Sequence, residues 1–326
     1  MKRQSLIFML LLAVACTMTA KPRTSAQLRM EAEKALKTNS LAQSVRAKKS
    51  SALKVLRQNT QITVMGYTDG GYAVIANDDT FSPVLGYSDA TLTDNPAPAF
   101  LWWMEAINAS LEKKLEEGQQ PAKVQPSAEY KDRVDELLTT RWNQDAPYNI
   151  TCPTYTVNGI KRNYVTGCVA TAMAQIMYYH KYPTKGKGNH SYTYTSEEGF
   201  GTVRAVANFE TPYDYDNMLP VYTTGKYTQE QANAVAKLMY HCGVSVEMHY
   251  TTTGSGAFSA DACRALRKYF LYDENIKLYT REVFPVDEWM NMVFRELSDG
   301  CPILYGGQSK SGGHSFVLDG YDENGL

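Results

Sequence analysis

The sequence predicts a mixed α+β protein made of two compact units behind an N-terminal leader. Its 326 residues exceed what one ordinary hydrophobic core accommodates, so we expect two units. Strand-like patterns occur at residues 61–67, 72–76 and 83–87, and helix-period apolar patterns at residues 25–36 and 100–115. These segments predict a small sheet-and-helix unit over residues 28–115, followed by a larger, loop-rich body.

Local signals support these elements in chain order. Thr24 or Ser25 can cap the first helix, because a short side-chain oxygen accepts a hydrogen bond from a free backbone N–H. The Asp-Gly-Gly run at residues 69–71 predicts a tight turn between the first two strands. Two prolines at residues 95–98 break the chain before the second helix. The polar segment 119–126, also with two prolines, predicts an exposed linker that proteases can reach.

Composition and charge are those of an ordinary folded protein in water. Apolar residues make up 44% of the chain and charged residues 21%, which indicates a globular rather than a disordered protein. The formal net charge is −1. With no basic or acidic excess, nothing predicts binding to nucleic acid, to an anionic membrane or to a strongly charged substrate.

The first 20 residues have the pattern of a signal peptide. Two basic residues at the start precede a short apolar run at residues 6–15, which ends in a small-x-small cleavage motif. The run is too short to span a bilayer. We therefore expect secretion to the exterior, the cell surface or the periplasm of a bacterium. Cleavage before Cys16 would expose that thiol for lipid attachment, whereas cleavage after Ala20 would remove it, and the sequence leaves both open.

The cysteine count predicts a free thiol. The six cysteines are Cys16, Cys152, Cys168, Cys242, Cys263 and Cys301. If Cys16 leaves with the leader, five remain and cannot all pair. An unpaired thiol outside the cytosol is open to oxidation, which favours a specific chemical use for it. No C-x-x-C pair occurs, so neither a zinc ribbon nor a thioredoxin-like site is expected.

The segment around Cys168 carries the strongest chemical signal. After Thr166 and Gly167, an Ala- and Met-rich stretch to His180 has helix-period apolar positions. Cys168 would lie in the first turn of that helix, where the helix dipole and unpaired backbone N–H groups favour a negative charge. The alternative is a small buried core residue. The spacing favours a nucleophile.

A thiolate nucleophile needs a base, and His314 fits best among the five histidines. It follows two Gly-Gly pairs and leads into the mostly apolar residues 315–321, which predicts a strand entered from a loop. Its distance of 146 positions from Cys168 is typical of papain-type enzymes. His180 lies on the same helix as Cys168, too far along the axis to pair with it.

The remaining histidines predict no chemistry. His190 lies in a polar loop, and His241, Cys242 and His249 cluster in the sequence. That cluster suggests a metal site, but its spacing fits no standard ligand pattern. We expect surface or structural roles for these residues.

Acyl transfer also needs donors for the oxyanion of the tetrahedral intermediate. The backbone N–H of Cys168, at a helix start, is a natural donor. Gln144, 24 residues upstream, offers a side-chain amide at the spacing that papain-like enzymes use. Taken alone Gln144 is a weak signal, because most glutamines are merely exposed.

Together these motifs resemble the streptopain family of bacterial cysteine peptidases, which includes the interpain type. The resemblance covers nearly everything after the leader. It is strongest at residues 142–149, in TGCVATAMAQIMYYHKYP (166–183) and in GGHSFVLDG (312–320), and extends to residues 243–256. The upstream runs GGYAVIANDD and PVLGYSD resemble the family's propeptide.

The resemblance implies a papain-like α+β fold behind a small α+β propeptide domain. A helical side would carry Cys168 and an antiparallel β side would carry His314, with the substrate between them. Cys168 would be the nucleophile and His314 the general base. Gln144 and the Cys168 N–H would form the oxyanion hole.

The resemblance also implies an order of domains. A signal peptide (1–20) would precede an inhibitory propeptide (21–123) and the catalytic domain (124–326), with cleavage near Lys123. The implied partners are protein or peptide substrates and the chain's own propeptide, with no nucleic acid and no membrane span. An apolar residue would precede the scissile residue of the substrate. Residues 306–313, rich in glycine, would be a mobile flap.

One departure from the family pattern affects the expected activity. Family members follow the histidine strand with a second strand, rich in Asn, Trp and Gly, that orients the histidine, whereas this sequence stops at Leu326. An imidazole without its orienting partner can adopt the wrong tautomer. We therefore expect this chain to be weakly active or inactive and its full-length parent to be a protease. Asp319 and Asp322 are near in sequence but are not favoured as substitutes.

Two alternatives stay open. The small unit could be a protease inhibitor joined to a non-catalytic remainder. Alternatively, the same residues could serve another Cys/His acyl transferase, such as a transglutaminase or an amide hydrolase. Motifs for metals, nucleotides and haem are missing, including His-Glu-x-x-His and a phosphate-binding glycine loop with lysine, so no cofactor is expected.

Overall fold

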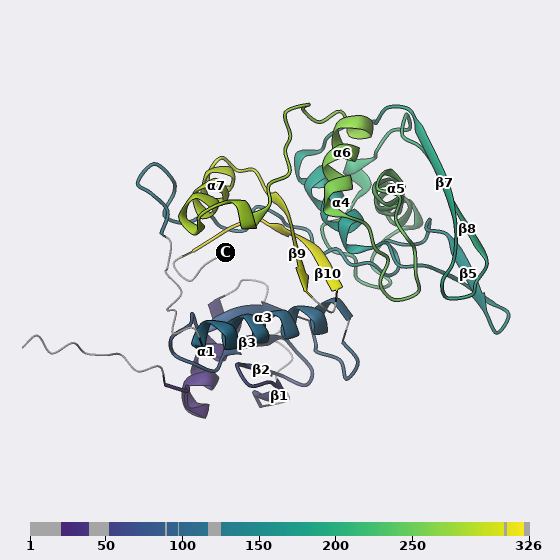
Figure 1. Ribbon diagram of the computed structural model, residues 1–326. Coiled ribbons are helices and arrows are strands. Elements are labelled where there is room, and N and C mark those ends of the chain that lie inside the picture. The colour runs from purple at the N-terminus through teal and green to yellow at the C-terminus, as the bar shows by residue number, and fades with distance from the viewer. Residues whose placement is uncertain are drawn as a thin grey trace, which may run out of the picture. The chain divides into compact units, whose positions relative to one another are not determined.

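The computed structural model describes residues 21–38, 52–88, 90–96, 98–116, 125–309 and 312–322. They form two compact units (Figure 1): Met1–Leu92 with Lys114–Pro121, and Thr93–Lys113 with Ala122–Leu326. The signal peptide and the cleavage site near Lys123 lie outside the described residues, so both stay predictions, as does the boundary at residue 123.

The smaller unit is a helix packed on an antiparallel sheet. Its elements are α1 (Ser25–Thr38), β1 (Lys54–Gln58), β2 (Ile62–Gly66), β3 (Tyr72–Ala76) and β4 (Val84–Ser88), with strand order β1-β2-β3-β4. Leu28, Ala32 and Leu36 of α1 are buried in one cluster with Met65 and Ile75 of the sheet. Helix α1 and strands β2, β3 and β4 confirm the predicted pattern. Strand β1 was not predicted, because the sequence around it is basic.

Helix α1 is capped by Thr24, which is one of the two residues that the sequence predicted for this role. Its hydroxyl accepts a hydrogen bond from the Gln27 N–H at 3.3 Å, and the Gln27 side chain accepts from the Thr24 N–H at 2.8 Å. These reciprocal bonds satisfy backbone donors that a helix start leaves without partners.

The larger unit contains helices and three antiparallel hairpins. Its elements are α3 (Pro98–Glu116, up to Lys113), β5 (Thr154–Val157), β6 (Ile160–Asn163), α4 (Cys168–His180), β7 (Asn189–Thr195), β8 (Thr202–Asn208), η1 (Tyr215–Asn217), α5 (Gln229–Ser245), α6 (Ser259–Phe270), η2 (Arg281–Val283), α7 (Val286–Ser298), β9 (Ile303–Ser309) and β10 (Gly312–Leu318). Helix α3 was expected in the small unit, but up to Lys113 its contacts group it with the larger one.

Helix α4 runs through the centre of the larger unit. It contacts α5 and α6 as well as β9 and β10 (Figure 1). Eight of its thirteen residues are buried, among them Ala170, Ala172 and Ala174. Such small side chains let neighbouring elements approach the helix closely. The core therefore forms around the segment that begins with Cys168.

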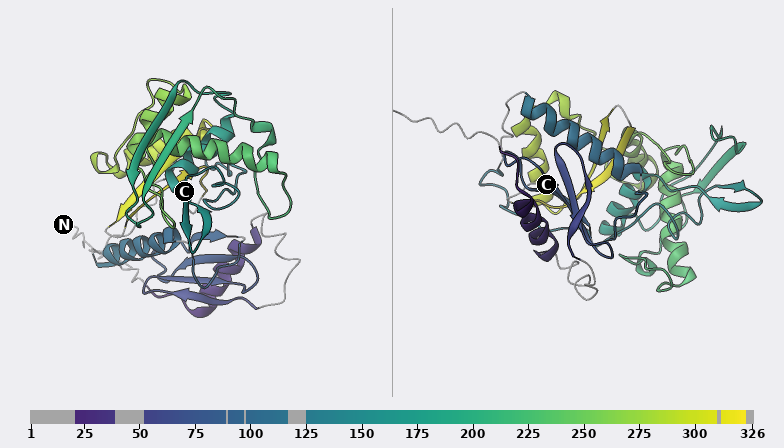
Figure 2. Two further views of the ribbon diagram at one scale, coloured as in Figure 1. Left: turned by 90° about the vertical axis from the view of Figure 1, so that its right-hand side faces the viewer. Right: turned by 90° about the horizontal axis from the view of Figure 1, so that it is seen from below.

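The β7–β8 hairpin covers the far side of this core from β9 and β10, as Figures 1 and 2 both show. Alternate residues of β8, namely Val203, Ala205 and Ala207, are buried in the core. On β7, the hydroxyl of Tyr194 donates to the Tyr250 carbonyl at 2.8 Å. The hairpin thus has one buried face and one exposed face, as expected for a half-buried antiparallel pair.

Residues 306–309 belong to a regular hairpin. Strands β9 and β10 pair in uninterrupted antiparallel register from Ile303↔Leu318 to Ser309↔Gly312. The predicted loop at residues 306–309 is therefore wrong, because the glycines there are held by ladder hydrogen bonds to β10. The mobility of this segment stays a prediction.

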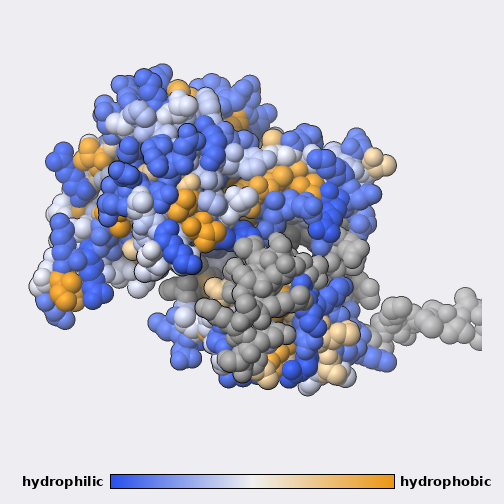
Figure 3. Space-filling model, turned by 180° about the vertical axis from the view of Figure 1, so that it is seen from behind, coloured by the Kyte–Doolittle hydropathy of each residue, from blue (hydrophilic) through white to orange (hydrophobic). Residues whose placement is uncertain are grey.

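The described surface is mainly hydrophilic on the face that Figure 3 shows. On the face shown in Figure 3, small hydrophobic patches are interspersed among hydrophilic residues. Within the described part of the chain, no helix has the length and apolar character needed to cross a membrane.

His241 is a buried histidine with one polar neighbour. The residue is 7% exposed, and its Nδ1 lies 3.0 Å from the Tyr213 hydroxyl. The Phe209 ring packs edge-on against it at 5.5 Å. Burial lowers the pKa of His241 to about 4, with the Lys237 charge contributing in the same direction. The fold therefore accommodates the neutral imidazole.

This burial predicts a loss of stability in acid. Above pH 6.5 His241 is neutral in both the folded and the unfolded chain, so its contribution is fully present. Between about pH 6.5 and pH 4 only the unfolded chain takes up the proton, and the free energy of unfolding should fall by about 3 kcal/mol. Urea unfolding of a Cys168→Ala chain across this range should show the fall, and His241→Gln should flatten it. An unchanged slope in His241→Gln would contradict the assignment, and His249→Gln, at a partly exposed position, is the control.

Candidate active site

Cys168 is the first residue of helix α4, as the sequence predicted. Its thiol is free and partly exposed. The N-cap residue, Gly167, provides no side-chain capping bond, so N–H groups of the first turn keep their capacity to stabilise an anion. Position and exposure both suit a nucleophile.

Gly167 is required by the geometry of this helix start. Its φ angle of +88° is one that residues with a side chain rarely adopt. A Cβ at this position would also lie 2.6 Å from the Met248 sulfur and 2.9 Å from the Ser255 carbonyl oxygen. The close approach of the segment 248–255 therefore fixes the backbone on which Cys168 sits.

Hydroxyl groups hold the backbone on either side of Gly167. The Ser255 hydroxyl donates to the Val165 carbonyl at 2.7 Å. The Thr171 hydroxyl donates to the Gly167 carbonyl at 3.0 Å and lies 3.0 Å from the Thr166 hydroxyl. Sequence reasoning assigned no role to these residues, although the resemblance included residues 243–256.

The backbone of Gln144 is tied to the irregular segment that leads into α4. Its carbonyl accepts a hydrogen bond from the Thr166 N–H at 3.1 Å, two residues before Cys168. Trp142 anchors the same loop, because its ring lies 5.0 Å from that of Tyr178 on α4 and its indole N–H donates to the Leu219 carbonyl at 2.8 Å. Gln144 is therefore held near the start of α4, and its role as an oxyanion donor stays a prediction.

His314 is the third residue of β10, in a partly buried position. Its ring lies 6.1 Å from the ring of Trp102 on α3 and 6.0 Å from that of Phe316. Burial lowers the pKa of His314, which favours the neutral imidazole. A neutral ring can accept a proton, as a general base must.

Alternation along β10 places His314 on one face of the hairpin with Phe316 and Leu318. Leu318 packs against the cluster that contains Phe294 of α7. The Phe316 ring lies 5.5 Å from that of its cross-strand partner Tyr305. We call this side of the hairpin the α7 face.

The opposite side of the hairpin faces the central helices. Ser315 and Val317 lie there, and Leu304, the cross-strand partner of Val317, packs against the same core cluster as Cys168. The Ser315 hydroxyl lies 2.9 Å from that of Ser259 on α6. We call this side the α4 face.

The structure packs the helix that carries Cys168 against the strand that carries His314, but no hydrogen bond joins these two side chains. Helix α4 packs against β10, but among the hydrogen bonds of the described residues none involves the thiol of Cys168 or the ring of His314. Asp319 does not orient the imidazole either, because its carboxylate accepts from the Leu138 N–H at 3.1 Å. The catalytic pairing of Cys168 and His314 stays a prediction.

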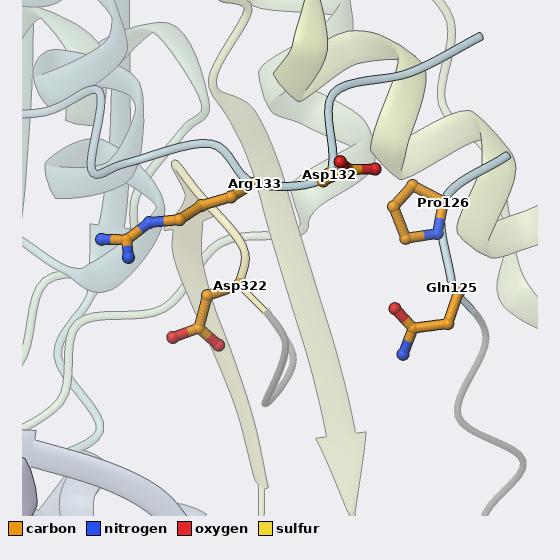
Figure 4. Close-up of a pocket in the computed structure, with 5 residues that line it drawn as sticks. All are labelled: Gln125, Pro126, Asp132, Arg133 and Asp322. Atoms are coloured by element: carbon orange, nitrogen blue, oxygen red, sulfur yellow. The ribbon is translucent and has the colours of Figure 1, made fainter. Parts of the chain in front are cut away.

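Other described features offer no competing site. A polar hollow of about 410 Å³ is lined by Gln125, Pro126, Asp132, Arg133 and Asp322. Figure 4 shows these side chains around it, and none of the predicted catalytic residues is among them. Over the described ranges, no group of three or more His, Cys, Asp or Glu residues could hold a metal ion.

Comparison with known proteins gives consistent matches. Residues 142–326 match the Peptidase C10 family. Streptopain of Streptococcus pyogenes is 33% identical over 279 residues, which span 79% of this chain and 68% of that protein. The thiol protease/hemagglutinin PrtT of Porphyromonas gingivalis is 30% identical over 269 residues, or 78% of this chain and 30% of that protein.

Two solved structures from Prevotella intermedia are also similar. A fragment of prointerpain A with a cysteine-to-alanine substitution has a TM-score of 0.73 and 40% identity, covering 85% of this chain and 87% of that one. Active interpain A has a TM-score of 0.56 and 43% identity, covering 62% of this chain and 83% of that one. These matches confirm the predicted streptopain-type cysteine peptidase and its papain-like α+β fold, and the chain is a cysteine peptidase precursor.

The surroundings of the thiols predict selective reactivity at Cys168. Burial raises the pKa of Cys152 to about 12 and also raises the pKa of the fully buried Cys242. A protonated, buried thiol reacts slowly with alkylating reagents. In the folded chain at pH 7, mass spectrometry should therefore find iodoacetamide on Cys168 at least about 100-fold faster than on Cys152 or Cys242. Unfolding in urea should remove the difference, and equal rates in the folded chain would contradict the prediction.

Proposed function

The chain belongs to the Peptidase C10 family, and from this premise we propose that it is a secreted cysteine endopeptidase precursor kept latent by its own propeptide. Cys168 acts as the nucleophile and His314 as the base. Gln144 and the Cys168 N–H stabilise the oxyanion. The observation that carries the proposal is the packing of α4, which begins with Cys168, against β10, which carries His314.

The proposed reaction is acyl transfer through a thioester. His314 takes the proton of the Cys168 thiol, and the resulting thiolate attacks the peptide carbonyl carbon while the carbonyl electrons move to the oxygen as an oxyanion. When the intermediate collapses, the C–N bond breaks and His314 passes a proton to the leaving amine. Water, deprotonated by His314, then attacks the thioester and releases the acid with regeneration of the thiol.

Latency follows in this proposal from the position of His314. The imidazole lies on the α7 face of the hairpin, whereas the core around Cys168 meets the α4 face. Trp102, within the predicted propeptide, lies against the hairpin end. A Cβ on Gly307 or Gly312 would be 3.7 or 3.8 Å from its ring. Trp102 thus contributes to holding the base away from the thiol.

Secretion is the second part of the proposal. It is supported by the signal-peptide pattern of the first 20 residues. An exported destination also gives a reason for latency, because a peptidase that is inactive until cleaved spares the cell that makes it. Pulse-labelling of the expressing bacterium should find the product, shortened at its N-terminus, outside the cytoplasm.

The nucleophile is tested by substitution. Cys168→Ala should abolish both the self-conversion of the purified precursor and its hydrolysis of casein, however weak these activities are in this chain, because no other group of the site can form the acyl-enzyme. A thiol-directed epoxide should have the same effect on the wild-type chain. Cys263→Ala, at a partly exposed cysteine that lies on α6 and not at the start of α4, is the matched control and should keep activity. Casein hydrolysis that survives in Cys168→Ala would contradict the proposal, and amide transfer to small amines without proteolysis would favour an acyl transferase.

The oxyanion donor is tested in the processed enzyme. Gln144→Ala should lower kcat about 100- to 1,000-fold with little change in KM, since the amide contributes mainly in the transition state. Gln125→Ala, at an exposed glutamine, should leave kcat unchanged. A rise in KM with kcat unchanged would argue instead for a role of Gln144 in substrate binding.

The latency contact is tested at Trp102. Trp102→Ala should speed conversion of the precursor about tenfold, because loss of about 1.4 kcal/mol of packing shifts an equilibrium by that factor. Trp103→Ala is the matched control, since the Trp103 ring stacks on Phe100, with centroids 6.1 Å apart. Time courses on gels would measure both rates. Equal acceleration by the two variants would mean general loosening of α3 rather than release of His314.

A further inference from the structure

A pair of serine hydroxyls joins the histidine strand to a helix of the central core. Ser259, the first residue of α6, and Ser315 of β10 lie with their oxygens 2.9 Å apart. Ser315 is only 6% exposed and directly follows His314. We call this contact the Ser259–Ser315 bridge. It is a polar link between β10 and α6 at the level of the predicted base.

The β9 strand is shaped to admit the bridge. Gly306 is the cross-strand partner of Ser315. A Cβ on Gly306 would lie 2.9 Å from the Ser259 oxygen and 3.5 Å from the Ser315 oxygen. Any side chain at position 306 would therefore crowd the Ser259 hydroxyl, and glycine leaves the space in which the two hydroxyls meet.

The bridge and the catalytic arrangement compete for one face of β10. Neighbouring residues of a strand point to opposite faces, so Ser315 and His314 cannot both lie on the α4 face. With the bridge formed, Ser315 is on the α4 face and His314 on the α7 face. For the imidazole to reach the thiol of Cys168, β10 has to turn or slip, and the bridge has to break.

We propose that the Ser259–Ser315 bridge is a latch that keeps His314 on the α7 face and so slows activation of the precursor. The inference rests on the catalytic pair and the latency of the proposed function. It assigns to Ser259 and Ser315 a positioning role that acts through His314. Breaking the latch favours the arrangement in which the base faces the nucleophile.

Conversion of the precursor provides the first test. A single hydrogen bond contributes about 1 kcal/mol, so Ser259→Ala should speed conversion about fivefold. Ser298→Ala is the matched control, because it removes a hydroxyl pair of the same 2.9 Å length, with Tyr321, away from His314. Ser259→Thr keeps the hydroxyl and should restore the wild-type rate.

Gly306→Ala tests the same latch by a different route. Its methyl group would push the Ser259 hydroxyl away, so this variant should also convert faster. Combined with Ser259→Ala, it should add nothing further, because the crowded oxygen is already gone and the next atom is 3.5 Å away. If the two substitutions sped conversion additively, the Gly306 methyl group would not act through the Ser259 hydroxyl, and this explanation of the Gly306→Ala effect would be overturned.

A readout independent of activity separates this inference from the proposed function. In a Cys168→Ala precursor with labelled histidines, Ser259→Ala should shift the NMR signal of His314 and raise its pKa, because the ring becomes less buried. Unchanged His314 signals, or conversion that is unchanged or slower, would overturn the latch while Cys168-dependent proteolysis still stood. Proteolysis by the precursor that persists without Cys168 would instead overturn the proposed function.

Discussion

The close packing around the start of helix α4 is the constraint on which the larger unit depends. Gly167 allows the Met248 sulfur and the Ser255 carbonyl to approach where any Cβ would collide with them. Beyond it, Ala170 and Ala174 are fully buried. Because the interior is close-packed, these small residues fix the path of the backbone that presents Cys168. The partly exposed thiol is therefore carried on a closely packed segment of the chain.

The predicted base, His314, is carried by a strand of a hairpin and not by the central helix. His314 lies on a two-stranded hairpin whose partner strand carries Gly306 and Gly307. Glycine at both positions leaves no side chain opposite His314 and Ser315 on that strand, so contacts such as those of the Trp102 ring and the Ser259 hydroxyl help to set the position of the hairpin. In the function that we propose, a fixed nucleophile and a displaceable base would let the precursor be folded and latent at the same time. Activation would then require movement of one hairpin rather than refolding of the core.

Much of the local structure was readable from the sequence. Helix-period patterns and turn residues located α1, β2, β3, β4 and α3 to within about two residues. The start of α4 at Cys168 was predicted because Thr-Gly before an Ala-rich run is a strong helix boundary. Strand β1 and the regular pairing of Gly306–Ser309 were missed. Both depend on a partner strand, which supplies hydrogen bonds that the local sequence does not reveal.

The sequence by itself determined the family, the papain-like fold and the identity of the candidate residues, because these follow from local patterns and from motifs along the chain. Only the tertiary structure decided which face of β10 carries His314 and which residues it meets there. Because side chains alternate along a strand, His314 and Ser315 point in opposite directions. Alternation does not determine which of the two faces the core. Packing against α6 and α7 makes that choice, and those contacts come from residues far apart in the chain.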